Sequence, residues 1–326
     1  MRKKLTSTTA LVFASLSLLN AGCPDGGKGT DPDAGLDAGP KPPEFQACSG
    51  DIDNAIDGTL DDKWTFLYDD KAFPTKDELD RGRDGTVDEI DEWGFDAHGN
   101  FTSYVAKNIA ADGTAKVYYQ QTEVYSDKDL LLERLIRMEN QDGTPPYIRL
   151  NKYSYDAAGK AVDFTTDKDA DGTIDSKTTY VYDGGAYYIR TETDSGLDGT
   201  INSVTKYARN AAGRVTQEDF DFSNNGSIDL VIAFTYDAAG HVLDQVETMP
   251  NDPAYETAFR STYDAMGRAE TYTFTASDTP ETNAKTTYVY GCGNGRSHAR
   301  RMFVAGAGRS EAQRLLRQVR AGRELE

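Results

Sequence analysis

The chain has 326 residues, a formal net charge of −19 at pH 7 and 10% aromatic residues. The two ends are net positive, through Arg2–Lys4 and through the eight Arg against three Glu of residues 296–326, so the intervening chain is more acidic than the total. This balance argues against nucleic acid or an anionic membrane surface as a direct partner. Solvation of a secreted domain explains most of the charge.

The N-terminus has the pattern of a secretory signal. Basic Arg2–Lys4 precedes an apolar run, Leu11–Leu19, that is too short to span a bilayer, and small residues then lead to Cys23. This stretch resembles bacterial lipoprotein signals, in which the cysteine after the small residues is lipidated and becomes the first residue. The resemblance implies that residues 1–22 are removed, that Cys23 is anchored in the membrane by lipid, and that Pro24 is compatible with an outer-membrane destination. Secretion without lipid is the alternative.

Residues 23–45 are expected to form a flexible tether. They consist mainly of Pro, Gly, Ala and Asp, and such a composition buries too little apolar surface to offset the entropy of ordering. The random-coil reach of such a segment is roughly 25 Å. The tether would hold the following domain away from the membrane surface.

Two marks recur at a nearly constant period through the rest of the chain. The first is Asp-Gly or Asn-Gly, every 27 to 30 residues, at Asp57, Asp84, Asp112, Asp142, Asp171, Asp198 and Asn225. The second is an aromatic residue followed by a turn, at Tyr68, Phe95, Tyr125, Tyr155, Tyr182, Tyr236, Tyr263 and Tyr290. A fixed period of this length indicates a repeat architecture, in which each unit buries its apolar face against its neighbours.

The segments between the marks have the alternation of β-strands. In one copy the residues that share a face are Ile174, Ser176, Thr178, Tyr180 and Tyr182. Lys177 falls on the other, solvated face. Return strands are expected at Lys160–Thr166 and Arg268–Thr275, and the short connections predict antiparallel hairpins, with roughly seventeen strands in total. A barrel embedded in lipid is not expected, because Asp175 and Lys177 would face a band that tolerates charge poorly.

The turn residues resemble the RHS/YD repeats. The matching turns contain Tyr155, Asp156 and Gly159; Tyr182 and Asp183; Tyr236, Asp237 and Gly240; and Tyr263, Asp264 and Gly267. Asp can cap the turn amides, and the glycine can adopt a left-handed conformation. The resemblance implies an all-β array of antiparallel hairpins in a curled or spiralling sheet, in a small cell-surface relative. There are too few repeats for a cargo shell, so a carrier function is not expected.

Cysteine usage predicts one disulfide. If Cys23 carries lipid, Cys48 and Cys292 are an even pair in an oxidising compartment, and they flank the repeats. A flat sheet of this many strands would be about 80 Å wide at about 4.8 Å per strand. The disulfide therefore requires the sheet to curl strongly or to coil back; the alternative is that these two cysteines do not pair.

One Asp-Gly loop has the spacing of half a calcium loop. Asp167, Asp169, Asp171 and Asp175 place carboxylates at alternating positions around Gly172. The acidic residue expected at the twelfth position is absent, and any affinity would be weak. The alternative is that Asp-Gly serves only as a favoured hairpin turn.

The basic tail, residues 296–326, is predicted to contain a short helix. Ser310 can cap it, and Leu315, Leu316 and Val319 form an apolar stripe beside arginines. The tail is expected either to be a frayed extension or to dock on an acidic partner, including the chain's own repeats.

These features predict a β-domain over residues 46–295 that acts as a non-enzymatic binding or structural module at the outer membrane or cell surface. A glycan or a surface protein is the expected partner, and calcium is the one cofactor considered. The three histidines lack a metal-protease spacing, and no phosphate loop or nucleophile elbow is present. A carbohydrate-active hydrolase that uses clustered carboxylates is the alternative.

Overall fold

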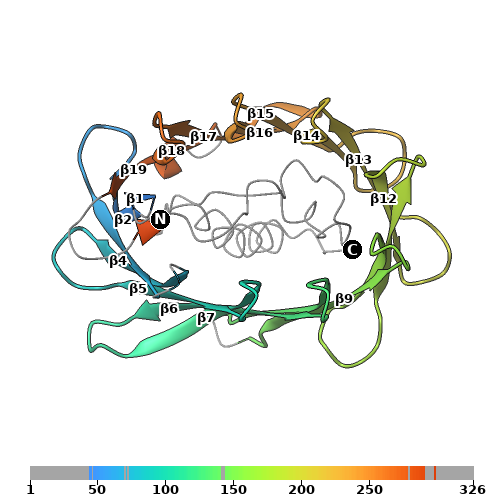
Figure 1. Ribbon diagram of the computed structural model, residues 1–326, viewed down its shortest axis with the longest axis horizontal. Coiled ribbons are helices and arrows are strands. Elements are labelled where there is room, and N and C mark those ends of the chain that lie inside the picture. Colours follow the sequence, from blue (N-terminus) through green and yellow to red (C-terminus); the bar gives the residue numbers. More distant parts are fainter. Residues whose placement is uncertain are drawn as a thin grey trace, which may run out of the picture.

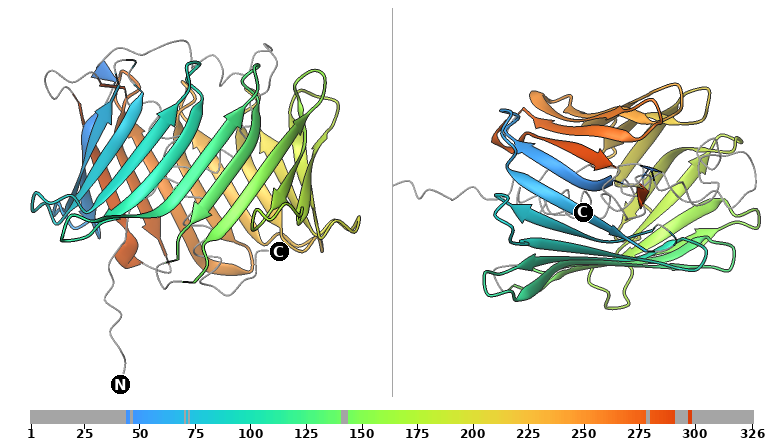
Figure 2. Two further views of the ribbon diagram at one scale, coloured as in Figure 1. Left: turned by 90° about the horizontal axis from the view of Figure 1, so that it is seen from below. Right: turned by 60° about the vertical axis from the view of Figure 1, so that its left-hand side comes forward.

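The chain folds into a closed barrel of eighteen antiparallel strands, β2 to β19. The computed structural model describes residues 44–45, 47–69, 71, 73–140, 144–277, 280–290 and 297–298. Each strand is hydrogen-bonded to its neighbours in the sequence, and β19 pairs with β2. Figure 1 looks along the barrel and shows an oval ring, and the side view in Figure 2 shows that the strands are tilted.

Most strands are seven to nine residues long, and they pair as successive hairpins. They are β1 (Glu44–Phe45), β2 (Ala47–Asn54), β3 (Asp62–Tyr68), β4 (Pro74–Arg81), β5 (Glu89–Phe95), β6 (Phe101–Ile109), β7 (Ala115–Tyr125), β8 (Leu131–Met138), β9 (Tyr147–Tyr155), β10 (Ala161–Asp167), β11 (Ser176–Tyr182), β12 (Tyr188–Ser195), β13 (Ser203–Arg209), β14 (Val215–Asp221), β15 (Leu230–Tyr236), β16 (Val242–Met249), β17 (Asp252–Tyr263), β18 (Ala269–Ala276), β19 (Ala284–Tyr290) and β20 (Ser297–His298). The predicted hairpins and return strands are confirmed.

The predicted curled or spiralling sheet is wrong, because the sheet closes into a barrel, whereas the predicted helix of the tail lies outside the described residues. β19 lies in register with β2 from Ala284 opposite Asn54 to Tyr290 opposite Ala47, so the sheet has no free edge. Within the described ranges the only helical turn is a 3₁₀ turn, Pro280–Thr282. The described part of the tail is strand β20, which pairs in parallel with β1; the rest of the tail lies outside the described residues. Closure depends on strand tilt and stagger accumulated over all the hairpins.

Alternate residues of each strand face the interior and the exterior, as closure requires. In β11, Ser176, Thr178 and Tyr180 are buried, whereas the side chain of Lys177 is 46% exposed. The barrel wall is a single sheet, and no second layer covers its outer face. The buried side chains of β11 must therefore face the interior. The predicted face of this strand is confirmed.

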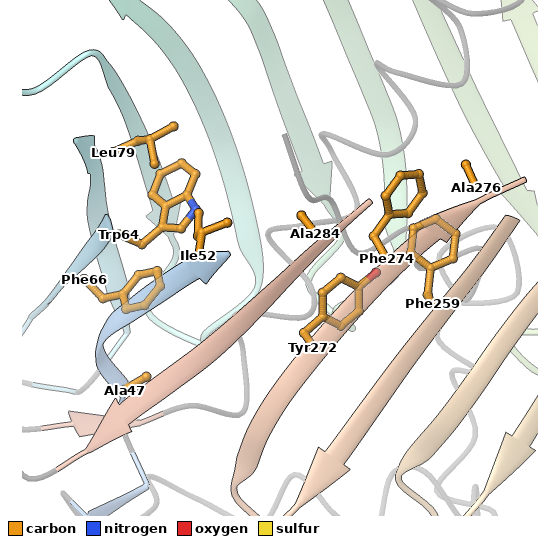
Figure 3. Close-up of a cluster of buried hydrophobic side chains, with 10 residues drawn as sticks. All are labelled: Ala47, Ile52, Trp64, Phe66, Leu79, Phe259, Tyr272, Phe274, Ala276 and Ala284. Atoms are coloured by element: carbon orange, nitrogen blue, oxygen red, sulfur yellow. The ribbon is translucent and has the colours of Figure 1, made fainter. Parts of the chain in front are cut away.

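The described residues form four apolar clusters spread around the inner wall. Figure 3 shows the cluster at the seam between the first and last hairpins, formed by Ala47, Ile52, Trp64, Phe66, Leu79, Phe259, Tyr272, Phe274, Ala276 and Ala284. Gly50 lies within this seam, where a Cβ atom would come within 2.9 Å of Thr286 Cγ2. The close approach of β2 and β19 therefore favours glycine at this position.

The outer face of the wall carries ion pairs between and along the strands. They include Lys76–Glu78, Lys107–Glu92, Lys177–Asp163 and Arg190–Glu192, with nitrogen–oxygen distances of 2.6 to 2.8 Å. Pairs this exposed contribute little to stability, but their polarity fits a surface in contact with water. Of the helices in the described residues, none has the length and apolarity needed to cross a membrane.

Candidate functional site

The barrel has two chemically different rims. The Asp-Gly loops join even-numbered strands to the odd-numbered strands that follow, and the Tyr-Asp turns join odd-numbered to even-numbered strands. Because every strand pairs with its sequence neighbours, all connections of one kind lie at one end of the barrel. We call these ends the Asp-Gly rim and the Tyr-Asp rim.

At the Tyr-Asp rim, one side-chain oxygen caps each turn. Asp156 Oδ1 accepts hydrogen bonds from the amides of Ala158 and Lys160, both at 2.9 Å, and Gly159 has a φ of 83°. Asn210 and Ser126 cap the same amides in the degenerate copies. The predicted turn mechanism is confirmed, and it needs an oxygen acceptor rather than a charge.

The turn tyrosines also link each repeat to the one before. Each hydroxyl donates to a backbone carbonyl 21 residues earlier, at 2.6 to 3.1 Å, in Tyr68, Tyr182, Tyr236, Tyr263 and Tyr290. The residue after the turn glycine lies against the tyrosine of the next such turn: Arg268 lies over Tyr290 at 4.7 Å, and His241 stacks on Tyr263 at 4.6 Å. Sequence reasoning missed this ladder, although the constant 22-residue spacing between the two residues was a visible signal.

The Asp-Gly loops share a second pattern of caps. Asp167 Oδ2 accepts from the amide of Gly172 at 2.8 Å, and Asp175 Oδ2 accepts from that of Lys168 at 2.6 Å. Asp171 Oδ1 accepts from the Thr173 amide at 2.7 Å, and this hydrogen bond lowers the pKa of the Asp171 carboxyl. Corresponding caps occur around Gly58, Gly85, Gly199 and Gly226.

The structure brings together three of the four predicted calcium ligands. Asp167, Asp169 and Asp171 each place one carboxylate oxygen within 4.8 Å of the others. Asp175 is not part of this group and caps the other side of the loop. In another copy the equivalent cap is made by Asn202, which is uncharged. Its Oδ1 accepts a hydrogen bond from the amide of Ser195 at 2.5 Å. The caps alone therefore do not require a metal.

The inner wall carries buried carboxylates that sequence reasoning did not treat as a site. Glu89 is 1% exposed and accepts hydrogen bonds from Tyr118 at 2.7 Å and Arg81 at 2.6 Å. Asp91, on the same face, is fully buried. The signal was present in the sequence, because Glu89 and Asp91 fall on the aromatic face of their strand.

The predicted covalent sites are only partly within the described chain. Cys48 lies on β2, whereas Cys23 and Cys292 lie outside the described residues. Ala47, next to Cys48, is paired with Tyr290, two residues before Cys292. The described chain thus brings Cys48 close to Tyr290 at the seam, and the disulfide itself stays a prediction.

Comparison with known proteins identifies no family for the chain. It matches no protein-family profile and no curated protein sequence. Similar solved structures include a Photorhabdus luminescens Tc holotoxin pore with TccC3 (13% identity, covering 69% of this chain and 14% of that chain, TM-score 0.28). Others are a TcdB2–TccC3–Cdc42 complex (13%, 74% and 16%, TM-score 0.32) and a porin-like protein from Bacteroides uniformis (10%, 75% and 96%, TM-score 0.42).

The chain spans about one seventh of the TccC3-containing chains that it matches. TccC3 is an RHS-repeat protein, so structures with RHS repeats are among the structural neighbours. Since every one of these TM-scores is below 0.5, the description of the fold rests on the strand pairing of this chain.

Proposed function

We propose that the protein is a non-enzymatic module of the cell envelope, anchored by lipid on Cys23, in which the barrel is a rigid structural body. The observation that carries this proposal is the burial of the aromatic face: Trp64, Trp93, Tyr104 and Tyr119 are all at most 9% exposed. Aromatic side chains arranged in this way pack the wall and are not presented to a glycan. A surface protein or glycan partner would instead meet the rims or the charged outer face.

The turn carboxylates support a structural role over a hydrolase. At the Asp-Gly rim, hydrogen bonds from the loop amides lower the pKa of Asp57, Asp112, Asp171 and Asp198. A glycosidase needs one carboxylic acid whose pKa is raised so that it can protonate the leaving group. The Asp-Gly and Tyr-Asp turns instead use their carboxylates as caps.

The anchor is tested by replacing Cys23→Ala, with Pro24→Ala as the matched control that keeps the cysteine. We expect the unchanged chain and the control to carry an acyl mass and to partition with membranes, and the Cys23 variant to do neither. A mature unchanged chain without lipid would contradict the proposed anchor. Limited proteolysis of intact cells then distinguishes a barrel on the cell surface from one facing the periplasm.

Calcium binding is proposed for one loop only, that of Asp167, Asp169 and Asp171, because their oxygens already converge. The cluster is exposed at two of its three residues and lacks a bidentate acidic ligand, so weak binding of a structural kind is expected.

A further inference from the structure

Five of the described Asp-Gly and Asn-Gly loops have the same hydrogen bond on the amide of the glycine. An aspartate five residues earlier in the chain places its Oδ2 at 2.7 to 3.0 Å from that nitrogen; the pairs are Asp53–Gly58, Asp80–Gly85, Asp167–Gly172, Asp194–Gly199 and Asp221–Gly226. Each of these carboxylates therefore holds the backbone nitrogen that directly follows the Asp or Asn of the turn.

That nitrogen is the group that makes Asp-Gly and Asn-Gly bonds chemically labile, since glycine has no side chain to hinder its approach. In the loop between β14 and β15, the Gly226 nitrogen can attack Cγ of Asn225. A nitrogen–Cγ bond forms, the Cγ–Nδ2 bond breaks, and ammonia leaves with the proton that the nitrogen gives up. Water then opens the succinimide ring to Asp or isoaspartate. At an Asp-Gly bond the same ring closure expels water in place of ammonia.

The carboxylate of Asp221 opposes this reaction in two ways. Ring closure removes the hydrogen from the Gly226 nitrogen, so it abolishes the 2.7 Å hydrogen bond to Asp221 Oδ2. The nitrogen must also gain negative charge before it attacks, and a carboxylate beside it disfavours that charge. Asp221 is 6% exposed, and its Oδ1 accepts a hydrogen bond from the Asn225 amide at 3.1 Å. The carboxylate is thus held in place by the loop that it protects.

The glycine turn itself does not require such a carboxylate. In the loop of Asp112, Gly113 has a φ of 82°, close to the 86° of Gly226. Its amide, however, donates to the carbonyl oxygen of Ala110 at 2.8 Å. The residue five positions before this glycine is Asn108. A neutral acceptor is therefore sufficient for the turn, and the recurring aspartate adds something that the turn geometry does not need.

We propose that the aspartate five residues before the glycine protects these loops against succinimide formation. Asp112, whose loop lacks this aspartate, is then the residue of the described loops at which isoaspartate forms first. The inference goes beyond the proposed function, because it concerns the chemical durability of the barrel and not its anchor or its partner.

The test follows Asn225, because its conversion to Asp or isoaspartate raises the mass of the peptide that contains it. The folded chain, Asp221→Ala and Asp229→Ala are incubated at mildly alkaline pH and mapped by mass spectrometry over time. Asp229 is the matched control, since it caps the same loop from the other side and accepts from the Phe222 amide at 2.8 Å. We expect deamidation to be several-fold faster in Asp221→Ala and nearly unchanged in Asp229→Ala.

Equal acceleration in both variants, or an unchanged rate in Asp221→Ala, would overturn the proposal. If Asp221→Ala does not fold, Asp221→Asn replaces it: loss of the charge should still speed deamidation, and an unchanged rate would count against the protecting carboxylate. The unchanged chain gives a second comparison. Isoaspartate should accumulate faster at Asp112 than at Asp171, because the Gly172 amide is held by Asp167; equal rates or the reverse order would also overturn the proposal.

Discussion

At the scale of single residues, the same kind of ion pair has different consequences on the two faces of the wall. Glu123 and Arg134 are buried on the inner face, and Glu123 also accepts hydrogen bonds from Gln121 and Tyr125. Arg137, three residues further along the same strand, pairs with Glu139 on the outside, where its side chain is 43% exposed. The wall therefore provides an internal comparison of buried and exposed charge.

We expect Arg134→Met to destabilise the barrel by about 3 to 5 kcal/mol, because it leaves Glu123 buried without a cation. The control, Arg137→Met on the same strand, should cost less than about 1 kcal/mol. Denaturant unfolding of both variants measures the difference. Equal losses would show that Glu123 is solvated through the interior, contrary to its burial.

Buried tyrosines predict a loss of stability at alkaline pH. Burial raises the pKa of Tyr263 to about 12, from an ordinary value of 10.0, and it also raises the pKa of Tyr68, Tyr288 and Tyr290. The unfolded chain therefore releases these protons first as the pH rises. Stability should be fully retained below pH 10 and fall between pH 10 and 12, by about 1.4 kcal/mol per pKa unit and group. Tyrosinate absorbance near 295 nm follows deprotonation, and fluorescence follows unfolding; we expect both to change over the same pH range. Deprotonation of these tyrosines at pH 10 in a barrel that stays folded would contradict the prediction.

At the scale of the hairpin, one repeat consists of two strands, a capped Asp-Gly loop and a capped Tyr-Asp turn. The hydroxyl ladder at the Tyr-Asp rim fixes each hairpin to its predecessor, for example from Tyr236 to the carbonyl of Val215 at 2.6 Å. The caps act within a turn, whereas the tyrosines act between repeats. The two functions of the Tyr-Asp dipeptide are therefore separable by mutation.

Replacing Tyr236→Phe should cost about 1 kcal/mol, because it removes the hydroxyl and keeps the ring. Tyr288→Phe is the matched control: the ring packs at the seam, but its hydroxyl makes no hydrogen bond with the described residues. Thermal or denaturant unfolding measures both. A larger loss in the control than in Tyr236→Phe would exclude the ladder as a source of stability.

The loop at Asp167–Asp175 is where calcium should have its effect. We expect a dissociation constant of roughly 0.1 to 1 mM and a rise in Tm at 10 mM calcium. Asp169→Asn should abolish the rise while leaving the Tm without calcium nearly unchanged. Asp198→Asn, in a loop that does not bring together three such carboxylates, is the control. If calorimetry shows no heat of binding and calcium does not raise the Tm, the loop does not bind calcium and serves only as a hairpin turn.

The sequence predicts the repeat unit well because the relevant forces are local. The alternation of Ser176, Thr178 and Tyr180 sets the buried face, and Asp156 with Gly159 sets the turn. Closure is not local, because it depends on the strand tilt accumulated from β2 to β19. The sequence of a single repeat does not determine this total tilt. The buried carboxylate of Asp91 was visible on the aromatic face, but its significance depends on its position opposite Asp77, which only the register shows.

At the scale of the whole molecule, the seam between β2 and β19 joins the first and the last strand of the described barrel. Its hydrogen bonds resemble those of the other junctions, and its side chains form one continuous cluster with their neighbours. Since Cys48 lies at this seam, the predicted disulfide would lock the ring at the place where it closes.

We expect non-reducing peptide mapping to find a Cys48–Cys292 bond, and its reduction to lower stability by about 2 to 4 kcal/mol or more, because the closed loop is long. Cys48→Ser and Cys292→Ser should each produce this loss, and the double variant should lose no more than either single one. Additive losses would show that the two cysteines act independently.

Closure also means that the barrel has no structural beginning. Every strand of the barrel pairs with its sequence neighbours, and β19 pairs with β2. The pairing therefore does not depend on which strand comes first in the chain. A circular permutant that opens the exposed turn at Asp183–Gly185, and joins the old ends with a linker, would keep every strand pair in place. The strand at which the chain begins could therefore differ by whole hairpins between related proteins that share the same closed barrel.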